Sequence, residues 1–549
     1  MMTAETYWQR AAKRKISRRS ALTGAATALG ASALALVGCS GGSETASVQW
    51  TPSPLDTPKP GGKAVFAIPL DPGSLDPQVN VISGYLSTRI HNPLHAINMS
   101  NLEFQPLVAE SLEYPDHLTY VWKLRHGVKF HNIDPTFGRE VTAADVVYSF
   151  DRLKAGPTLN DRKLLTLHTD KYEAIDDYTF SLRTNKLFSP TVDHTGNFAY
   201  SIVPHEAVDK WDGLAMNASG CGAWILADYT RAERVHLRRN PDYYQRGRPF
   251  PDEEEWLPVT DLGSLWQMFK TGRADYVGIN LDKLKRQEIE GKPEFQVAKS
   301  PSLFTINCYV RVDRPPFSDE RVREALDIAI DRDDYIEKMY FGDGKYNGPI
   351  PWPLEYWALP QDELRSTLAY DPTKARQLLS AAGYADGLDL DTPVAAFGDS
   401  PKIAVIIKDH YAKIGVTLKN RQKELGAFLA QDLYGHNFDM AIFLNLPYME
   451  PDIILRSYYS KGQQADVNPG LSNDPEVDGL IEGLWSIFDL EEKKQAVLDC
   501  QRVILKKHGP MYPLCSPEGY AGFSSRMRGL EEGTGLIGWM GISYWVEES

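Results

Sequence analysis

The sequence predicts an α/β protein built from two or more domains. Short apolar segments typical of strands alternate with amphipathic segments typical of helices, and no repeat of fixed period is visible. The chain has 549 residues, 42% of them hydrophobic, which is enough to form a large core. A single compact domain usually contains fewer residues, so we expect two or more domains. The net charge of −14, with no basic stripe, argues against nucleic acid as a partner.

The N-terminal residues have the layout of an export signal. A basic start that includes Arg18 and Arg19 is followed by an uncharged run from Ser20 to Gly38. The alternative is an uncleaved membrane-spanning helix, because a run of this length is long enough to cross a bilayer. Glycines and hydroxyl residues dilute the run, however, and so make it a poor permanent span. We therefore predict an export signal over residues 1–39 that does not remain as a membrane span.

Two short motifs specify this signal further. Leu36-Val37-Gly38-Cys39 resembles the bacterial lipobox, which implies that Cys39 is lipidated and becomes the first residue of the mature protein. Ser17-Arg18-Arg19 resembles the twin-arginine export motif. Residues 40–60 are rich in Gly, Ser, Thr and Pro and read as a flexible tether, about 70 Å long when extended. We expect the body to contact the membrane through its lipid alone.

Four segments of the body have strand patterns. Residues 63–69 (KAVFAIP) and 438–445 (FDMAIFLN) are short apolar runs, which favours buried strands. Residues 119–125 (TYVWKLR) and 178–184 (YTFSLRT) alternate bulky apolar with polar side chains, as half-buried strands do. We expect the last two to pair.

Helices are indicated by capping residues as well as by periodicity. Thr142 and Asp145 form a capping box before an apolar face. Ser318 precedes an acidic first turn and a second apolar face. Asp371-Pro372 and Asp474-Pro475 each place an N-cap before a first-turn proline, and Gly383 is placed to end the first of these two helices.

Few residues suggest catalysis or metal binding. There is no CxxC, HExxH, GxSxG or P-loop motif. The acidic run 252–255 is typical of a solvated surface, and the spacing of the histidines between 91 and 131 includes no helical pair with a partner acid. We therefore predict no metal, cofactor or catalytic group. The remaining cysteines are expected to be mostly free, buried thiols, although their even number also permits disulfides: Cys221, Cys308, Cys500 and Cys515.

Taken in order, seven segments resemble the family 5 extracytoplasmic solute-binding proteins, the peptide- and nickel-type receptors of ABC importers. The resemblance covers nearly all of residues 61–545. The segments are GGKAVFAIPLDPGSLDPQ (61–78), LVAESLEYPDHLTYVWKLRHGVKFHN (107–132), VTAADVVYSFDRL (141–153), SGCGAWILADY with VHLRRNPDYY (219–244), RPPFSDERVREALDIAIDRDDYI (314–336), DPTKARQLLSAAGY (371–384) and FDMAIFLNLPYMEPD (438–452).

The resemblance implies a large periplasmic-binding-protein-like fold with two lobes, a ligand cleft between them and an extra inserted domain. Crossovers near residues 300 and 505 are expected to act as a hinge. The implied divisions are lobe I in 61–95, 199–299 and 506–549, the inserted domain in 96–198, and lobe II in 300–505.

The resemblance also implies a set of ligand-contacting residues. Residues after the Asp76-Pro77 turn, those of the glycine-rich loop and those of the 438–452 segment match family segments that face the ligand. For the tryptophans of the 348–357 segment, buried packing is the alternative to a stacking contact. The residues are Val81, Ser83, Trp224, Trp352, Trp357, Asn445 and Tyr448.

One position departs from the peptide-binding members. In those proteins an aspartate of the 438–452 segment pairs with the α-ammonium group of the peptide, and Pro447 stands in its place here. Glu424 or Glu450 is a substitute from a nearby position. We therefore expect a ligand without that group, such as an oligosaccharide, an opine-like conjugate or a blocked peptide.

The implied function is that of an extracytoplasmic substrate-binding lipoprotein, in the periplasm or on the outer face of the cytoplasmic membrane. Its partners are expected to be a small or peptide-like ligand and ABC permease subunits, with the protein itself a monomer. The alternative is an extracytoplasmic hydrolase or metal-dependent enzyme on the same body.

The signal generates a direct test. Replacing Cys39→Ser is expected to release the body from the membrane fraction, because the thiol that would carry the lipid is gone. Mass spectrometry of the wild-type membrane fraction should show a modified Cys39 as the first residue. A mature N-terminus at any other position, or an intact Met1, would contradict the prediction.

Overall fold

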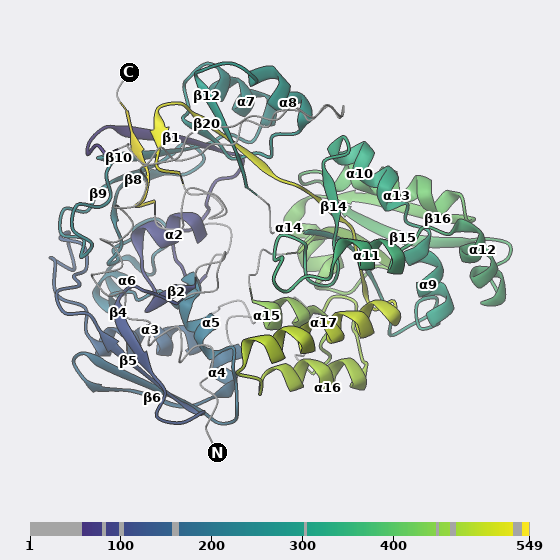
Figure 1. The fold of residues 1–549 in the computed structure, drawn as a ribbon, viewed down its shortest axis with the longest axis horizontal. Coiled ribbons are helices and arrows are strands. Elements are labelled where there is room, and N and C mark those ends of the chain that lie inside the picture. The colour runs from purple at the N-terminus through teal and green to yellow at the C-terminus, as the bar shows by residue number, and fades with distance from the viewer. Residues whose placement is uncertain are drawn as a thin grey trace, which may run out of the picture.

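The computed structural model describes residues 57–79, 84–97, 104–155, 164–300, 305–445, 450–461, 468–530 and 541–547. Within them, the largest sheets lie in two bodies placed side by side (Figure 1). We call the seven-stranded sheet with its helices the first lobe, the four-stranded sheet with its helices the inserted domain, and the five-stranded sheet with its helices the second lobe. The predicted α/β class is confirmed. No helix in the described ranges is both long and apolar enough to cross a bilayer.

The sheet of the first lobe has the order β12-β20-β11-β1-β10-β9-β8. β1 (Lys63–Ile68) lies inside it, parallel to β10 (Glu253–Pro258) and to β11 (Tyr276–Val277). This confirms the buried strand predicted at 63–69. The other strands are β8 (Trp224–Thr230), β9 (Arg234–Arg239), β12 (Phe295–Lys299) and β20 (Tyr520–Ser524).

A buried ion pair joins three parts of the first lobe. Arg89 at the end of α2 (Gly84–Ile90) places Nε 2.7 Å from Glu254 Oε2, and both side chains are 0% exposed. Trp256 and Tyr544 donate to the same carboxylate at 2.9 and 2.7 Å. The remaining elements of this lobe are α6 (His205–Trp211), α7 (Leu262–Lys270), α8 (Lys283–Ile289), β21 (Met527–Arg528) and β22 (Trp545–Val546).

The inserted domain is a sheet of order β4-β5-β7-β6 covered by α3 (Ala143–Ala155). β5 (Thr119–Leu124) and β7 (Thr179–Thr184) pair antiparallel, which confirms the predicted pairing. One half of the predicted capping box is present, because the Asp145 carboxylate accepts the N–H of Thr142 at 2.9 Å, whereas the N–H of Asp145 donates to the backbone carbonyl of Thr142 at 3.0 Å. The remaining elements here are β2 (His95–Ile97), β3 (Phe104–Pro106), β4 (Ala109–Glu113), β6 (Thr169–Asp176), α4 (Leu164–His168) and α5 (Thr191–Gly196).

The sheet of the second lobe has the order β16-β15-β17-β13-β18. β17 (Met440–Asn445) is antiparallel to β13 (Thr305–Val310), so the strand predicted at 438–445 is confirmed. The other strands are β14 (Gly344–Tyr346), β15 (Leu388–Ala395), β16 (Val416–Lys423), β18 (Met511–Pro513) and β19 (Cys515–Pro517). The helices are α9 (Glu320–Ile328), α10 (Arg332–Tyr340), α11 (Gln361–Thr367), α12 (Pro372–Ala381), α13 (Ser400–Ala412), α14 (Leu425–Ala427), α15 (Pro451–Leu455), α16 (Pro475–Leu484) and α17 (Leu490–Lys506).

Three of the predicted helix ends in this lobe are confirmed and one is corrected. Asp371 and Asp474 accept backbone N–H groups at the starts of α12 and α16, and Gly383 follows α12 with a φ of +95°. The cap of α9 is Asp319, one residue after the expected Ser318. The Asp319 carboxylate accepts the N–H of Arg321 at 2.9 Å and so takes the capping role.

The chain passes from the first lobe to the second between β12 and β13. It returns between β19 and β20, because β18 pairs with β13 and β19 pairs with β14, whereas β20 joins the first sheet. The return crossing predicted near residue 505 is therefore wrong and lies beyond residue 517. The other predicted domain boundaries stay a proposal.

The four cysteines of the body are separate from one another. Cys221, Cys308, Cys500 and Cys515 are all free and buried, as expected. Burial raises the pKa of each thiol to about 12, so none is a reactive thiolate near neutral pH.

The Arg89 ion pair predicts a large stability difference between two similar substitutions. Glu254→Gln is expected to destabilise the protein by about 3–5 kcal/mol, because Arg89 keeps its buried charge without a counter-charge. Asp389→Asn breaks an ion pair with Lys419 whose side chains are 60% and 61% exposed, and should leave the unfolding midpoint almost unchanged. Urea unfolding followed by tryptophan fluorescence measures both. Equal midpoints for the two variants would contradict the assigned role of the pair.

Candidate functional site

Among the described residues, hydrogen bonds join the two sides of the molecule at two places. The first is beside the crossings, where Arg286 of α8 forms an ion pair with Asp343 and the N–H of Glu518 donates to the carbonyl of Asp343 at 2.9 Å. The second is at the far end, where the inserted domain contacts the turn between α16 and α17 through Ser189. A ligand held between the lobes would lie between a hinge and this second contact.

The predicted ligand residues fall into two groups. Val81, Ser83 and Tyr448 lie outside the described residues, as does Pro447. Asn445 is the last residue of β17, where its backbone is in register with Thr305 of β13.

The three tryptophans predicted as ligand contacts are packed in the interior. Trp224 is 0% exposed and its indole N–H donates to the carbonyl of Gly541 at 3.3 Å, and the ligand contact at Trp224 stays a prediction. Trp352 and Trp357 are 7% and 6% exposed. Of the two interpretations given above for this pair, the structure agrees with buried packing. An aromatic residue near a cleft is a weak signal, because large apolar side chains mostly fill cores.

The glycine-rich loop at 219–223 packs tightly against the C-terminal end of α2. A Cβ at Gly220 would lie 2.1 Å from the carbonyl oxygen of Ile90, and one at Gly222 would lie 2.2 Å from that of Arg89. Only glycine allows the loop to approach the end of α2 this closely.

Two buried histidines are fixed in a neutral form. His95 accepts from the indole N–H of Trp122 at 3.3 Å and contacts the carbonyl of Val192 at 2.9 Å. His131 accepts from the N–H of Gly220 at 3.3 Å and contacts the carbonyl of Gly222 at 3.1 Å. Each ring therefore carries its proton on Nε2 and has no free nitrogen for a metal.

The effect of burial on the pKa values of the histidines agrees with neutral rings. It lowers the pKa of His91 to about 3 and those of His95 and His131 to about 4. These three histidines are structural. Across the described residues, no group of three or more potential metal ligands is assembled.

Charged groups from distant segments meet at the far contact. Lys493 of α17 lies 2.6 Å from the buried carboxylate of Asp452. Burial raises the pKa of Asp193 on α5 well above its usual range; Lys493 opposes this rise, whereas Glu450 and Asp452 add to it. Sequence reasoning missed Asp193, Asp452 and Lys493, because they come from three segments whose approach only the fold reveals.

The two acids named as substitutes for the missing aspartate differ in their surroundings. Glu424 caps α14, where its carboxylate accepts the N–H groups of Gly426 and Ala427 at 2.9 and 3.1 Å. Glu450 stands at the N-cap of α15 without a side-chain cap bond, within electrostatic reach of Asp193. Of the two acids, Glu450 is thus the one that lies near the buried Asp193 of the far contact.

A cavity of about 370 Å³ lies elsewhere, in the second lobe between α9, α16 and α17. Its charged groups already have partners. Lys507 lies 2.7 Å from the Asp474 carboxylate, and Arg323 donates to the carbonyls of Phe317 and His508 at 2.9 Å each. The charged side chains named here are therefore already engaged and are not available to bind a ligand in this cavity.

Comparison with known proteins gives one consistent result. The model of "Bacterial extracellular solute-binding proteins, family 5 Middle" matches residues 103–466. Heme-binding protein A of Haemophilus influenzae is 27% identical over 83% of this chain and 87% of its own length. The dipeptide-binding protein of Pseudomonas aeruginosa is 25% identical over 85% of this chain and 92% of its own length.

The fold comparison agrees. The periplasmic binding protein DppA of Helicobacter pylori, solved with the peptide STSA, superposes with a TM-score of 0.78. It is 25% identical, and the match covers 89% of this chain and 99% of that protein. The predicted two-lobed fold is thereby confirmed. All of these proteins are substrate-binding proteins of transport systems, so the alternative of a hydrolase or metal-dependent enzyme is dropped.

The buried histidines predict a loss of stability in acid. Their pKa values are lower in the folded than in the unfolded protein, so the unfolded chain takes up protons first as the pH falls below about 6.5. Each histidine should therefore remove about 2 kcal/mol of stability between pH 6.5 and 5. His95→Gln should lose its share of this slope, as measured by urea unfolding at both pH values. An unchanged slope in the variant would overturn the assignment of His95.

Proposed function

Since the chain belongs to the family 5 bacterial extracellular solute-binding proteins, we propose that it is the substrate-binding lipoprotein of an ABC importer. It would capture a peptide-like or other small solute between its lobes and deliver it to the permease subunits in the membrane. The relatives are named for binding dipeptides and heme, and supply the general class of solute but not the ligand of this chain.

The observation that carries this proposal is the pair of crossings between two lobes that are built on separate sheets. The chain runs from β12 to β13 and back from β19 to β20, so a change of backbone dihedral angles in a few residues can rotate one lobe against the other. Such a hinge allows the lobes to close over a solute, and needs no catalytic group.

The membrane attachment belongs to the same proposal. Cys39 would carry the lipid, and residues 40–60 would hold the body off the bilayer. An importer receptor has to stay near its permease, and a lipid at the N-terminus achieves this without a membrane-spanning segment.

The ligand class follows from the charges near the 438–452 segment. Pro447 offers neither a charge nor a donor, and Glu424 is occupied at a helix start. Glu450 lies within electrostatic reach of the buried Asp193, so it is the acid that the test below has to examine. Because Pro447 stands in the place of the aspartate that pairs with an α-ammonium group, we retain a solute without that group, such as an opine-like conjugate, an oligosaccharide or a blocked peptide, with Asn445 and Tyr448 among its contacts.

A thermal shift screen tests both the function and the ligand class. Peptides, sugars, opine conjugates and metal chelates are added to the purified protein, and each compound is checked for chemical change. At least one compound should stabilise the protein without being altered, because a ligand at one hundred times its Kd adds about 2.7 kcal/mol. An N-acetylated peptide should raise the melting temperature more than the same peptide with a free amine, whose unpaired charge costs several kcal/mol in a closed site.

The Glu450→Gln variant is the matched control for the ligand class. Submicromolar binding of a free-amine peptide that acetylation abolishes would overturn the proposed class. If Glu450→Gln abolished that binding as well, Glu450 would be identified as the replacement for the missing aspartate. Turnover of a stabilising compound would overturn the receptor function itself.

A further inference from the structure

Ser189 of the inserted domain makes three hydrogen bonds to the second lobe. Its N–H donates to the carbonyl of Trp485 at 2.7 Å, and its hydroxyl donates to the carbonyl of Leu484 at 3.2 Å. The same hydroxyl accepts from Lys493 Nζ at 3.0 Å. Both the donor and the acceptor capacity of this serine are used across the contact, and Ser189 itself is 2% exposed.

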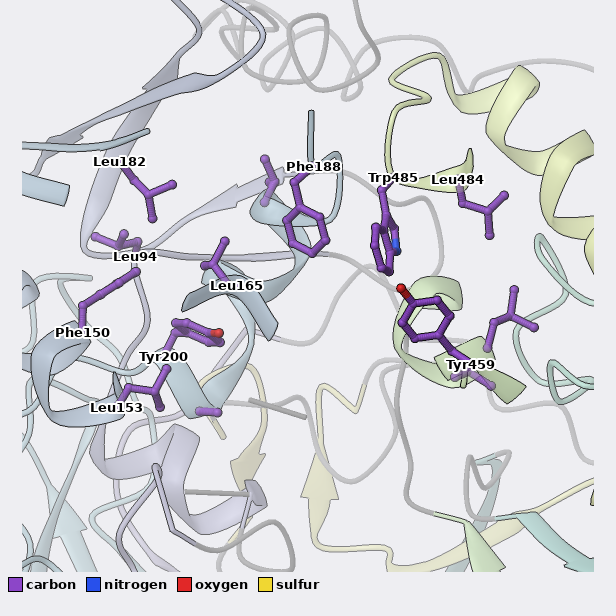
Figure 2. Packing of buried hydrophobic residues seen from close by; sticks show 14 of the residues in the cluster. Leu94, Phe150, Leu153, Leu165, Leu182, Phe188, Tyr200, Tyr459, Leu484 and Trp485 are labelled. Carbon is purple, nitrogen blue, oxygen red and sulfur yellow. The ribbon is translucent and has the colours of Figure 1, made fainter. Parts of the chain in front are cut away.

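The neighbouring Phe188 packs against the same turn. Its ring centroid lies 5.8 Å from that of Trp485 in an edge-on geometry, and the two side chains are 0% and 3% exposed. Figure 2 shows Phe188 facing Trp485, with Tyr459 and Leu484 behind it on the second lobe. His168 and Lys186 of the inserted domain also contact the Trp485 ring, at 5.1 and 4.7 Å. The indole is thus enclosed by the inserted domain on more than one side.

Separating the lobes at this place would leave several groups without partners. Lys493 would keep Asp452, at 2.6 Å, but would lose the Ser189 hydroxyl. The carbonyl of Trp485 would lose its donor, that of Leu484 would keep only the N–H of Ile487 at 3.2 Å, and the Trp485 ring would become exposed to water. Each of these losses disfavours opening.

We propose that Phe188 and Ser189 of the inserted domain form a latch that grips Leu484, Trp485 and Lys493 of the second lobe and holds the two lobes closed. The latch shares no residue with the predicted ligand contacts Val81, Ser83, Asn445 and Tyr448. It therefore stabilises the closed form whether or not a ligand is present, and a ligand that has been trapped leaves more slowly because of it. This last consequence rests on the proposed function, whereas the latch itself does not.

The test measures lobe separation in the full chain without any ligand. Ile175→Cys on β6 and Val405→Cys on α13 place spin labels on the two bodies, at positions 59% and 56% exposed. The four native cysteines of the body are buried, so labelling should be selective for the new ones. Distance distributions between the two spin labels, measured by double electron–electron resonance, then report the ratio of open to closed protein.

Two substitutions weaken the latch and one serves as a control. Ser189→Ala removes the hydroxyl and should raise the open-to-closed ratio about tenfold, the effect of one or two buried hydrogen bonds. Trp485→Leu removes the gripped ring and should shift the ratio in the same direction. Ser486→Ala is the matched control, because the exposed Ser486 hydroxyl bonds only the carbonyl of Gly483 within the same turn, at 2.9 Å. It should leave the ratio unchanged.

The outcomes separate the latch from the proposed function. Distance distributions for Ser189→Ala and Trp485→Leu that match that of Ser486→Ala would overturn the latch, even if the protein binds a solute well. A shift towards open protein supports the latch even if no solute is ever found. Once a ligand is known, its dissociation rate should rise about tenfold in Ser189→Ala. An unchanged rate would overturn the link to ligand retention.

Discussion

The structure depends on one constraint of connectivity, which is that the polypeptide passes between its two large sheets twice. A chain of this length is expected to form more than one compact domain, and its large sheets lie in separate bodies. The two passages join those bodies at one edge, beside β14 and β19, where Arg286 of α8 meets Asp343. Everything away from that edge, including the contact between Ser189 and Trp485, is free to form or separate as the lobes move.

Much of the fold could be predicted from local sequence. Alternating residues gave β5 and β7, and aspartates followed by proline marked the starts of α12 and α16, because these signals lie within a few residues of the structure they specify. The place of β18 could not be predicted in this way. Its partner β13 is far away in the sequence, and nothing within residues 511–513 indicates which of the two sheets they join.

The candidate site was less predictable than the fold. An aromatic ring suits a binding surface and a protein interior equally well, so the sequence alone could not show that Trp224 would be fully buried. The pair of Lys493 with Asp452 and the approach of Asp193 were invisible, because each residue by itself looks like an ordinary helix residue. Charge networks of this kind are properties of the packed lobes and become readable only once the helices have been placed.

The position of β20 has a consequence for how the protein is made. This strand comes from residues 520–524 and yet lies inside the first sheet, between β12 and β11, and Tyr544 then completes the hydrogen bonds of the Arg89 ion pair. During synthesis all five strands of the second lobe's sheet have been made by residue 513, before β20 of the first lobe's sheet has been made. Biosynthesis therefore imposes an order in which the lobe that begins the polypeptide is the last to be finished.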